Sequence, residues 1–226
     1  MNAVSRRPEA HNYIATDGYP LYYTLFHAAT VDYQKKLPDG SAYFAVAKPD
    51  ADPIKAMECV KRATIVYIYG HGAPGYIGFG PKGGWYAKWQ EGIKKECAID
   101  QNDFRTVKFT GFVGCNTALT DRVYGNLLDE AIKQGATAAL GFRDRLGYNP
   151  SEIEKDPGII WTKEFWKAAL GWLDEDNNGQ LDSPKSIKGA ARHALEEVKK
   201  KTGSYWGYDS WEVRGEDLLL APARCK

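Results

Sequence analysis

The chain has no strong charge of either sign. It holds 30 Lys and Arg residues against 29 Asp and Glu residues in a total of 226, which gives a formal net charge of +1. Proteins that bind nucleic acids or membrane surfaces electrostatically usually carry an excess of basic residues. We therefore expect no nucleic-acid partner.

Long apolar runs are also missing. No stretch approaches the roughly 20 apolar residues that a membrane-spanning helix needs, and the N-terminal MNAVSRRPEA has no apolar core of the kind found in secretory signals. We expect a soluble protein without a membrane span. It would be cytoplasmic as the sequence is written, and exported if a signal peptide has been removed.

Cysteine is scarce, and the four cysteines form no CxxC pair: Cys59, Cys97, Cys115 and Cys225. Their number and uneven spacing argue against a disulfide scaffold, a cysteine-rich zinc site and thioredoxin-type chemistry. Each cysteine must therefore be judged by its own surroundings.

The sequence does contain an alternation of β-prone and helix-prone segments. The predicted strands are 21–26, 42–47, 64–70, 107–114, 136–142 and 211–220, and the predicted helices are 53–63, 85–96, 123–135, 159–173 and 186–201. Strand–helix–strand units of this length favour right-handed crossovers and a parallel sheet. We expect a single domain over residues 1–226, of the α/β class, built as a three-layer α/β/α sandwich with a mainly parallel sheet.

Two of these strands end in side chains typical of nucleophilic catalysis. TIVYIYG runs into His71 and Gly72, and VKFTGFVG runs into Cys115. The carboxyl ends of parallel strands meet at the edge of the sheet where active sites form. A thiol is a poor nucleophile until it is ionised, and a nearby imidazole can take its proton. The pattern predicts a cysteine hydrolase.

The residues around this pair support the same chemistry. A backbone N–H can approach a substrate closely where no Cβ intervenes, so Gly72 and Cys115 could form an oxyanion hole. A helix beginning near 116–121 would place its positive end beside the thiol. The alternative is that His71 is a hydrogen-bonded residue at a strand end and Cys115 a small buried one.

The segments TIVYIYGHGAPG and VKFTGFVGCNTA resemble the caspase–hemoglobinase fold of the clan CD cysteine peptidases, which caspases, legumain, gingipains, clostripain and separase share. HGAPG is most similar to legumain-like sequences, whereas GCNTA followed by KQGATAALGF is more similar to gingipain and clostripain. His71 and Cys115 are 44 positions apart, against about 50 in caspases. The resemblance covers about residues 63–142.

This resemblance implies that Cys115 attacks a peptide carbonyl and that His71 protonates the leaving amine. It also implies a specificity pocket in the loop 143–158, whose charged residues are Arg143, Asp144, Arg145, Glu152, Glu154 and Asp156. Both acidic and basic substrate residues remain open on charge grounds. Val113 departs from the acidic residue or glutamine that many members have two positions before the cysteine, which leaves open a catalytically inactive relative.

A second resemblance is to the α/β-hydrolases. YGHGAPG is similar to their oxyanion segment, and a cysteine can replace the serine of their nucleophile elbow, with His193 as a late base. The elbow, however, needs glycines two positions before and after the nucleophile, where this chain has Val113 and Thr117. The surroundings of His193 predict an ordinary helix.

The segment DEDNNGQLD, which begins at residue 174, has the oxygen spacing of an EF-hand loop, with glycine at position six. It predicts an inserted structural calcium loop at 174–185 with the ligands Asp174, Asp176, Asn178, Gln180 (through its carbonyl) and Asp182. Position twelve is Lys185 in place of the usual glutamate, which would weaken binding. The alternative is a solvated acidic turn between two helices.

These observations lead to one main hypothesis: a calcium-stabilised cysteine endopeptidase that hydrolyses peptide or protein substrates through a His71–Cys115 dyad and a thioester acyl-enzyme. The alternative from another class is a catalytically inactive calcium-binding or scaffold domain of the same fold. The substrate, the preferred cleavage residue and the oligomeric state stay open.

Overall fold

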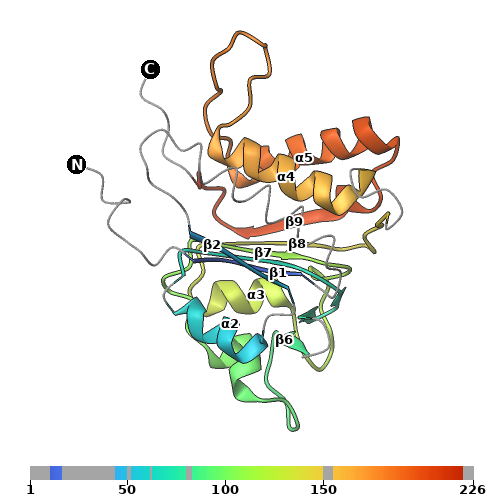
Figure 1. The fold of residues 1–226 in the computed structure, drawn as a ribbon. Helices are drawn as coiled ribbons and strands as arrows, with labels where there is room; N and C mark the ends of the chain where they lie inside the picture. Colours follow the sequence, from blue (N-terminus) through green and yellow to red (C-terminus); the bar gives the residue numbers. More distant parts are fainter. Residues whose placement is uncertain are drawn as a thin grey trace, which may run out of the picture.

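A six-stranded sheet forms the centre of the computed structural model, which describes residues 11–16, 44–49, 52–61, 63–79, 83–149 and 155–220 (Figure 1). Across the sheet, the strands follow the order β2 (Phe44–Pro49), β1 (His11–Thr16), β3 (Ile65–Tyr69), β7 (Phe109–Val113), β8 (Ala138–Phe142) and β9 (Trp211–Gly215). All neighbouring pairs are parallel except β8 and β9. The expected mainly parallel sheet is confirmed.

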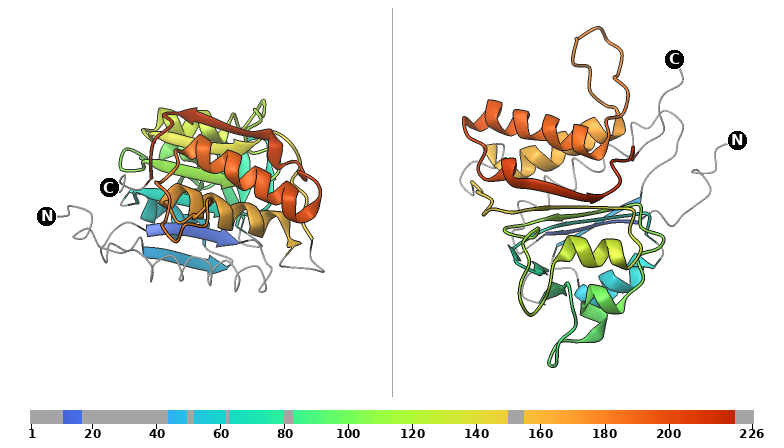
Figure 2. Two further views of the ribbon diagram at one scale, coloured as in Figure 1. Left: turned by 90° about the horizontal axis from the view of Figure 1, so that it is seen from above. Right: turned by 180° about the vertical axis from the view of Figure 1, so that it is seen from behind.

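Helices cover both faces of this sheet (Figures 1 and 2). One face carries α4 (Pro157–Leu170) and α5 (Ile187–Thr202), and the other carries α2 (Pro53–Val60) and α3 (Leu127–Lys133). A small antiparallel sheet of β4 (Gly72–Ala73), β5 (Tyr76–Gly78) and β6 (Gly84–Tyr86) lies on the α2 and α3 side. The short 3-10 helices are η1 (Lys95–Cys97), η2 (Ile99–Gln101) and η4 (Tyr208–Ser210). The predicted three-layer α/β/α sandwich is thus confirmed.

The central strands β3, β7 and β8 are almost entirely apolar because each is buried on both faces. In β3, Ile65 and Tyr67 face the core under α4 and α5, whereas Val66 and Ile68 face the core beside α2 and α3. This alternation follows from the two-residue period of a strand. Burial on both faces fixes the register of β3 against its neighbours.

Side-chain caps set where the helices begin. Asp52, Asn126, Asp156 and Ser186 each accept backbone N–H groups at the first turn of α2, α3, α4 and α5 in that order. Both α4 and α5 are followed by a glycine in the left-handed conformation. These boundaries agree with the helices expected at 53–63, 159–173 and 186–201 to within a few residues.

Two predicted helices differ from the structure. In place of the helix 85–96, the chain forms β6 and then turns, because Trp85 is buried and donates its indole N–H to the carbonyl of Pro53 (2.8 Å). The helix expected at 123–135 begins only at Leu127, since Asp121 holds the preceding turn by accepting the N–H groups of Val123 and Tyr124. The strand predicted at 21–26 lies outside the described residues.

Among the described helices, none combines the length and apolar character that crossing a bilayer requires.

Candidate active site

The register of β3 and β7 brings the two candidate catalytic residues to neighbouring positions. Tyr69 pairs with Val113, and the N–H of Gly70 donates to the carbonyl of Val113 (3.1 Å), which continues the pairing past the end of β3. His71 follows the end of β3 by two residues, and Cys115 follows the end of β7 by two residues. Adjacent strands lie about 4.8 Å apart. The segments that carry His71 and Cys115 therefore leave neighbouring strands at the carboxyl edge of the sheet.

Glycines allow the two segments to approach closely. A Cβ on Gly72 would lie 2.8 Å from the backbone nitrogen of Cys115 and 2.7 Å from Cγ2 of Thr117. A Cβ on Gly114 would lie 2.7 Å from the carbonyl oxygen of Gly70. Real side chains do not make such contacts, so both positions require glycine.

His71 itself is exposed, and its backbone belongs to the hairpin of β4 and β5. The N–H of Gly78 donates to the carbonyl of His71 (2.7 Å), which makes these two residues a hydrogen-bonded pair. Gly72 and Ile77 form the next pair along this ladder. Because hydrogen-bonded and non-hydrogen-bonded pairs alternate, this pair is not hydrogen-bonded, and its N–H groups point away from the partner strand. The N–H of Gly72 is thus directed away from β5 and is free of the ladder.

Cys115 opens a tight turn instead of a helix. Asn116 adopts the left-handed conformation (φ 58°), and its N–H donates to the carbonyl of Asp144 (3.0 Å). The N–H of Ala118 donates to the carbonyl of Phe142 (2.9 Å) at the end of β8. The expectation of a helix beginning near 116–121 is wrong, so no helix dipole acts on the thiol from this side.

The sulfur of Cys115 lies against the loop that follows β8. The N–H of Leu146 points at Sγ (3.3 Å), and Sγ lies 3.8 Å from the carbonyl oxygen of the same residue. Sequence reasoning missed this contact because Leu146 contributes only backbone atoms, which leave no mark in a residue pattern.

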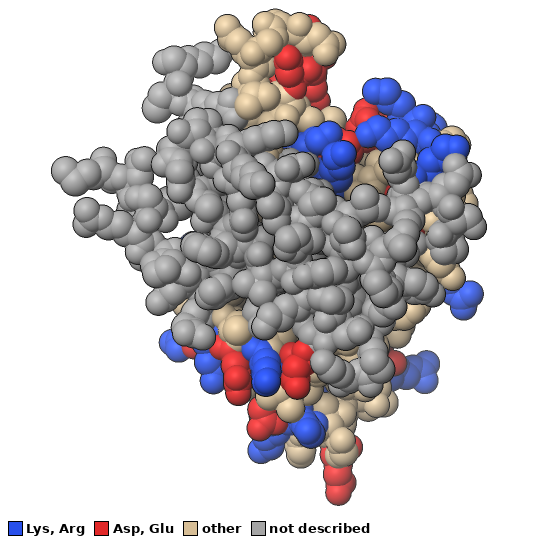
Figure 3. Space-filling model, in the orientation of Figure 1, with Lys and Arg blue, Asp and Glu red and all other residues tan. Residues whose placement is uncertain are grey.

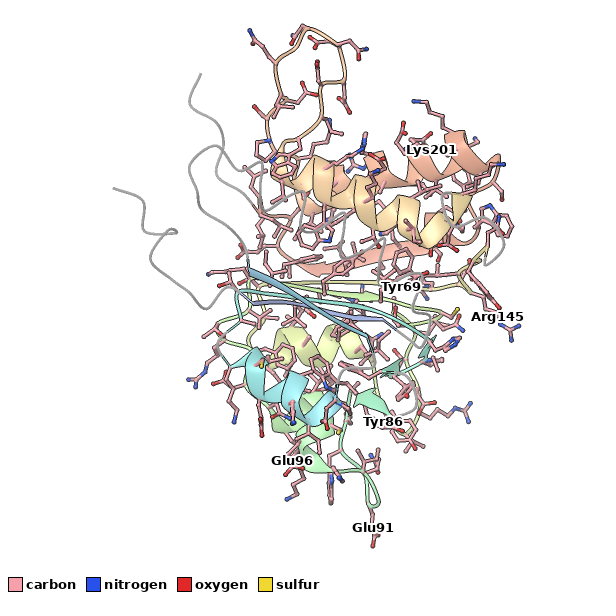
Figure 4. All side chains as sticks on the ribbon, viewed as in Figure 1. Tyr69, Tyr86, Glu91, Glu96, Arg145 and Lys201 are labelled. Carbon is pink, nitrogen blue, oxygen red and sulfur yellow. The ribbon has the colours of Figure 1, made fainter. Side chains whose placement is uncertain are left out.

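The loop 143–149 is anchored mainly by its backbone. The N–H of Asp144 donates to Oγ of Ser210 (3.0 Å), and the N–H of Gly147 donates to the carbonyl of Trp206 (2.8 Å). Arg143 forms an ion pair with Glu212 (2.9 Å), whereas Arg145 points outward from this edge of the molecule (Figure 4). The loop therefore presents one paired and one outward-pointing arginine.

Asp156 serves as a structural anchor. Its carboxylate is fully buried, caps α4 through the N–H groups of Gly158 and Ile159, and also accepts the N–H of Asn149 (2.7 Å). Of the charged residues expected to set specificity, Asp156 is thus committed to holding the loop. Glu152 and Glu154 lie outside the described residues.

Two tyrosines pack beside this anchor. Burial raises the pKa of Tyr208 well above its usual value, and the neighbouring Tyr69 and Asp156 raise it further. Tyr208 therefore keeps its proton. Gly158 leaves room for both phenols, since a Cβ there would lie 2.7 Å from the Tyr208 hydroxyl. A Cβ on Gly158 would also lie 2.7 Å from the ring of Tyr69, so the start of α4 packs against the last residue of β3.

His193, the base of the α/β-hydrolase alternative, lies in the helix layer. Its Nδ1 is 3.2 Å from Glu175 and its Nε2 is 3.8 Å from Glu164. Its surroundings are therefore carboxylates of α4 and of the loop between α4 and α5. Its side chain is 15% exposed, which fits a packed helical residue.

The acidic loop between α4 and α5 projects from the helix layer, and red acidic atoms are visible on it (Figures 1 and 3). Its polar side chains bind its own backbone: Asp174 accepts the N–H groups of Asn178 (2.9 Å) and Gly179 (3.0 Å), and Asp182 accepts that of Glu175 (3.0 Å). Asn178 in turn donates its side-chain amide to Asp176 (2.6 Å) and accepts the N–H of Gln180 (2.7 Å).

The oxygen donors of this loop are of the type that calcium prefers. Within the described part of the chain, however, no three acidic, histidine or cysteine side chains converge on one point that could hold a metal ion. Asp174, Asp176 and Asp182 would have to reorient to share an ion.

No model of a known protein family matches the sequence, and no curated protein is significantly similar to it. Solved structures do share the fold. Gingipain R (RgpB), an Arg-specific cysteine proteinase, aligns over 93% of this chain and 46% of its own, with a TM-score of 0.56 and 14% identity. The complex of the pro- and mature domains of RgpB from Porphyromonas gingivalis aligns over 94% of this chain and 48% of its own, with a TM-score of 0.58 and 14% identity.

The separase of Saccharomyces cerevisiae, in its complex with securin, aligns over 91% of this chain and 12% of its own, with a TM-score of 0.53 and 12% identity. This chain thus spans about half of the gingipain structures and a small part of separase. Both neighbours are clan CD cysteine peptidases. The expected caspase-like fold is confirmed.

Proposed function

We propose that this protein is a cysteine endopeptidase that uses a dyad of Cys115 and His71. The observation that carries the proposal is the parallel pairing of β3 with β7, because His71 and Cys115 each follow one of these two strands by two residues. The backbone contact of Gly72 with Cys115 supports it independently. The similarity to peptidases of the same fold adds to it without assigning the active site.

In the proposed mechanism, Sγ of Cys115 attacks the carbonyl carbon of a peptide bond and forms a tetrahedral adduct. The N–H groups of Gly72 and Cys115 stabilise the negative oxygen. His71 protonates the leaving amine as the C–N bond breaks, which leaves a thioester. Water then attacks the thioester, gives a proton to His71 and releases the thiolate. The substrates would be peptides or proteins.

The second candidate is an inactive domain of the same fold. The observation in its favour is the position of the loop 143–149, because both the N–H and the carbonyl of Leu146 face the sulfur of Cys115. A substrate carbonyl would have to approach from another side or displace this loop.

Labelling with a peptidyl acyloxymethyl ketone separates the two candidates, because this reagent needs a positioned thiolate. In the peptidase, Cys115 reacts far faster than the half-buried Cys59, and His71→Ala slows the reaction by about 100-fold or more. His193→Ala is the matched control and keeps the rate. Equal reactivity of Cys115 and Cys59 toward a panel of basic, acidic and apolar peptidyl ketones would favour the inactive domain.

We also propose that the loop 174–185 binds calcium weakly and stabilises the α4–α5 pair. The carboxylate and amide oxygens of Asp174, Asp176, Asn178 and Asp182, with the Gln180 carbonyl, are hard ligands in EF-hand order. The loop lies at the end of the helix pair away from the loop 143–149, so the ion would have a structural role (Figure 1).

Thermal melting tests this second proposal. Millimolar calcium should raise the Tm of the wild type, whereas Asp176→Ala should abolish the shift. Magnesium serves as the control, since it binds reluctantly to such loops. A concentration of 10 mM calcium is roughly ten times the dissociation constant of the weakest loops of this type. A Tm that does not change at this concentration would contradict calcium binding.

A further inference from the structure

Thr117 is a fully buried polar residue in the turn that follows the proposed nucleophile. Its hydroxyl shares its single hydrogen between the carbonyl oxygens of Phe112 (2.8 Å) and Gly114 (3.1 Å), and its oxygen accepts the N–H of Phe142 (3.0 Å). One side chain therefore ties the end of β7, the residue before Cys115 and the end of β8 together.

Two neighbouring chain segments approach the Thr117 side chain closely, each at a glycine. A Cβ on Gly141 would lie 3.0 Å from the Thr117 hydroxyl, and one on Gly72 would lie 2.7 Å from its methyl carbon. The glycines on the two neighbouring segments thus make the space in which this side chain sits. Its methyl group contacts the segment of His71, while its hydroxyl holds the segment of Cys115.

We refer to the contacts of the Thr117 hydroxyl with Phe112, Gly114 and Phe142 as the clamp. The conformation of Asn116 explains why this turn has to be held. It lies between Cys115 and Thr117 in the left-handed conformation (φ 58°), which costs free energy for a residue with a side chain. A strained turn persists only where its surroundings hold it. The Thr117 hydroxyl supplies this restraint at the residue before Cys115, and the side-chain amide of Asn126 adds to it by donating to the carbonyl of Ala118 (2.8 Å).

We infer that Thr117 is a positioning residue for the proposed reaction: its hydroxyl fixes the turn so that Sγ of Cys115 and the Cys115 N–H face the same substrate carbonyl. This inference rests on the proposed peptidase function for its chemical consequence. The clamp itself is a structural claim that can be measured without any activity.

Three variants separate the hydroxyl from the bulk of the side chain. Thr117→Val keeps the shape and removes the hydroxyl, and Thr117→Ser keeps the hydroxyl and removes the methyl. The matched control is Thr110→Val. Thr110 is equally buried on β7, and its hydroxyl has no hydrogen-bond partner within the described residues.

The first readout is the rate at which the peptidyl acyloxymethyl ketone labels Cys115 in folded protein. Thr117→Val should slow labelling by at least about tenfold, because small displacements of a nucleophile have large kinetic effects. Thr117→Ser should label Cys115 at a rate within about threefold of the wild type, and Thr110→Val at a rate within about twofold. These changes are small compared with the effect of misplacing the nucleophile. A Thr117→Val protein that melts lower but labels at the wild-type rate would show a merely structural role and overturn the inference.

The second readout is amide hydrogen exchange, which does not depend on activity. Thr117→Val should accelerate exchange of the Phe142 amide by about tenfold or more, as expected for a lost local hydrogen bond, and Thr110→Val should not. If no peptidyl ketone labels the wild type, the peptidase proposal fails while this measurement still decides the clamp. Should Thr117→Val not fold, exchange in the wild type decides: a Phe142 amide as unprotected as those of the loop 143–149 would overturn the clamp.

Discussion

Gly72 and Cys115 are in backbone contact across the ends of β3 and β7, although they are separated by more than forty residues in the chain. Gly72→Ala would place a methyl group 2.8 Å from the nitrogen of Cys115. We expect a loss of about 1–3 kcal/mol in the free energy of unfolding, as for other overpacked sites.

The same substitution should slow labelling of Cys115 by about 100-fold, because it separates the His71 segment from the thiol. Urea denaturation and labelling kinetics measure the two effects. Gly189→Ala is the control, because the nearest atom to its Cβ would be Cβ of Lys185 at 3.2 Å, in place of the 2.8 Å approach to backbone at Gly72. A Gly72→Ala protein with wild-type stability would contradict the backbone contact.

Gly147→Ala tests the loop that covers the sulfur. A methyl group at this position would overlap the indole ring of Trp206, so the loop and its Leu146 N–H must move. We expect labelling of Cys115 to fall by about three- to tenfold, within the range of small misplacements. Trp206→Gly removes the indole and suits the left-handed backbone of that residue (φ 54°).

A double-mutant cycle measures whether the two positions act through their contact. Gly147→Ala combined with Trp206→Gly should label faster than Gly147→Ala alone. Strictly additive effects would show that the indole is not what displaces the loop.

Asp156→Ala removes the cap of α4 and the partner of the Asn149 N–H at once. Loss of the cap should cost about 1–2 kcal/mol of stability, and release of the loop 143–149 should raise the KM for peptide substrates. Asp52→Ala is the matched control because it removes the equivalent cap of α2. It should reduce stability in urea denaturation to a similar extent and leave KM unchanged; an equal rise of KM in both variants would refute the role assigned to Asp156.

Glu164 should make stability depend on pH. Burial raises its pKa, but the neighbouring His193, together with the hydrogen bonds from Lys201 (2.8 Å) and Lys167 (3.1 Å), outweighs burial, so its pKa lies well below the usual value. A carboxyl group with a depressed pKa stabilises the folded state above the pKa of the unfolded chain, which is about 4.3 for glutamate. That contribution is lost progressively as the pH falls toward the folded-state pKa.

Glu164→Gln should therefore destabilise the protein at pH 7 by about 1–3 kcal/mol, since Lys167 and Lys201 retain access to solvent. The difference from the wild type should shrink between pH 5 and pH 3, a range that brackets the unfolded-state value. Urea denaturation across this range measures it, with the exposed Glu91→Gln as control (Figure 4). A difference that is independent of pH would contradict the assignment.

The sequence was sufficient to predict the core strands, and His71 and Cys115 do follow two strands that are neighbours in the sheet. The strands β3, β7 and β8 are short and apolar on both faces, and glycine directly follows β3 and β7, so their length is well marked in the sequence. Parallel neighbours then bring their carboxyl ends together whatever the loops do. The helices α4 and α5 were predicted at 159–173 and 186–201, and the structure moves the limits of α4 to the Asp156 cap and to Gly171.

Other parts depended on tertiary contacts that no local pattern records. Trp85 is followed by residues of acceptable helix propensity, yet the bond from its indole to Pro53 and the pairing of β6 with β5 override that preference. Leu146 reaches the sulfur only through its backbone. Thr117 was noted as a missing glycine, and its role as the hub of three hydrogen bonds became visible only in three dimensions.

Because the thiol of Cys115 lies where β3, β7 and the loop after β8 converge, its surroundings do not exist until strands distant in sequence have paired. Parallel pairings of this kind close long loops and are among the slower events of folding. The rate at which Cys115 acquires its native reactivity during refolding should thus report the completion of the central sheet, later than the formation of α4 and α5 as measured by far-UV circular dichroism.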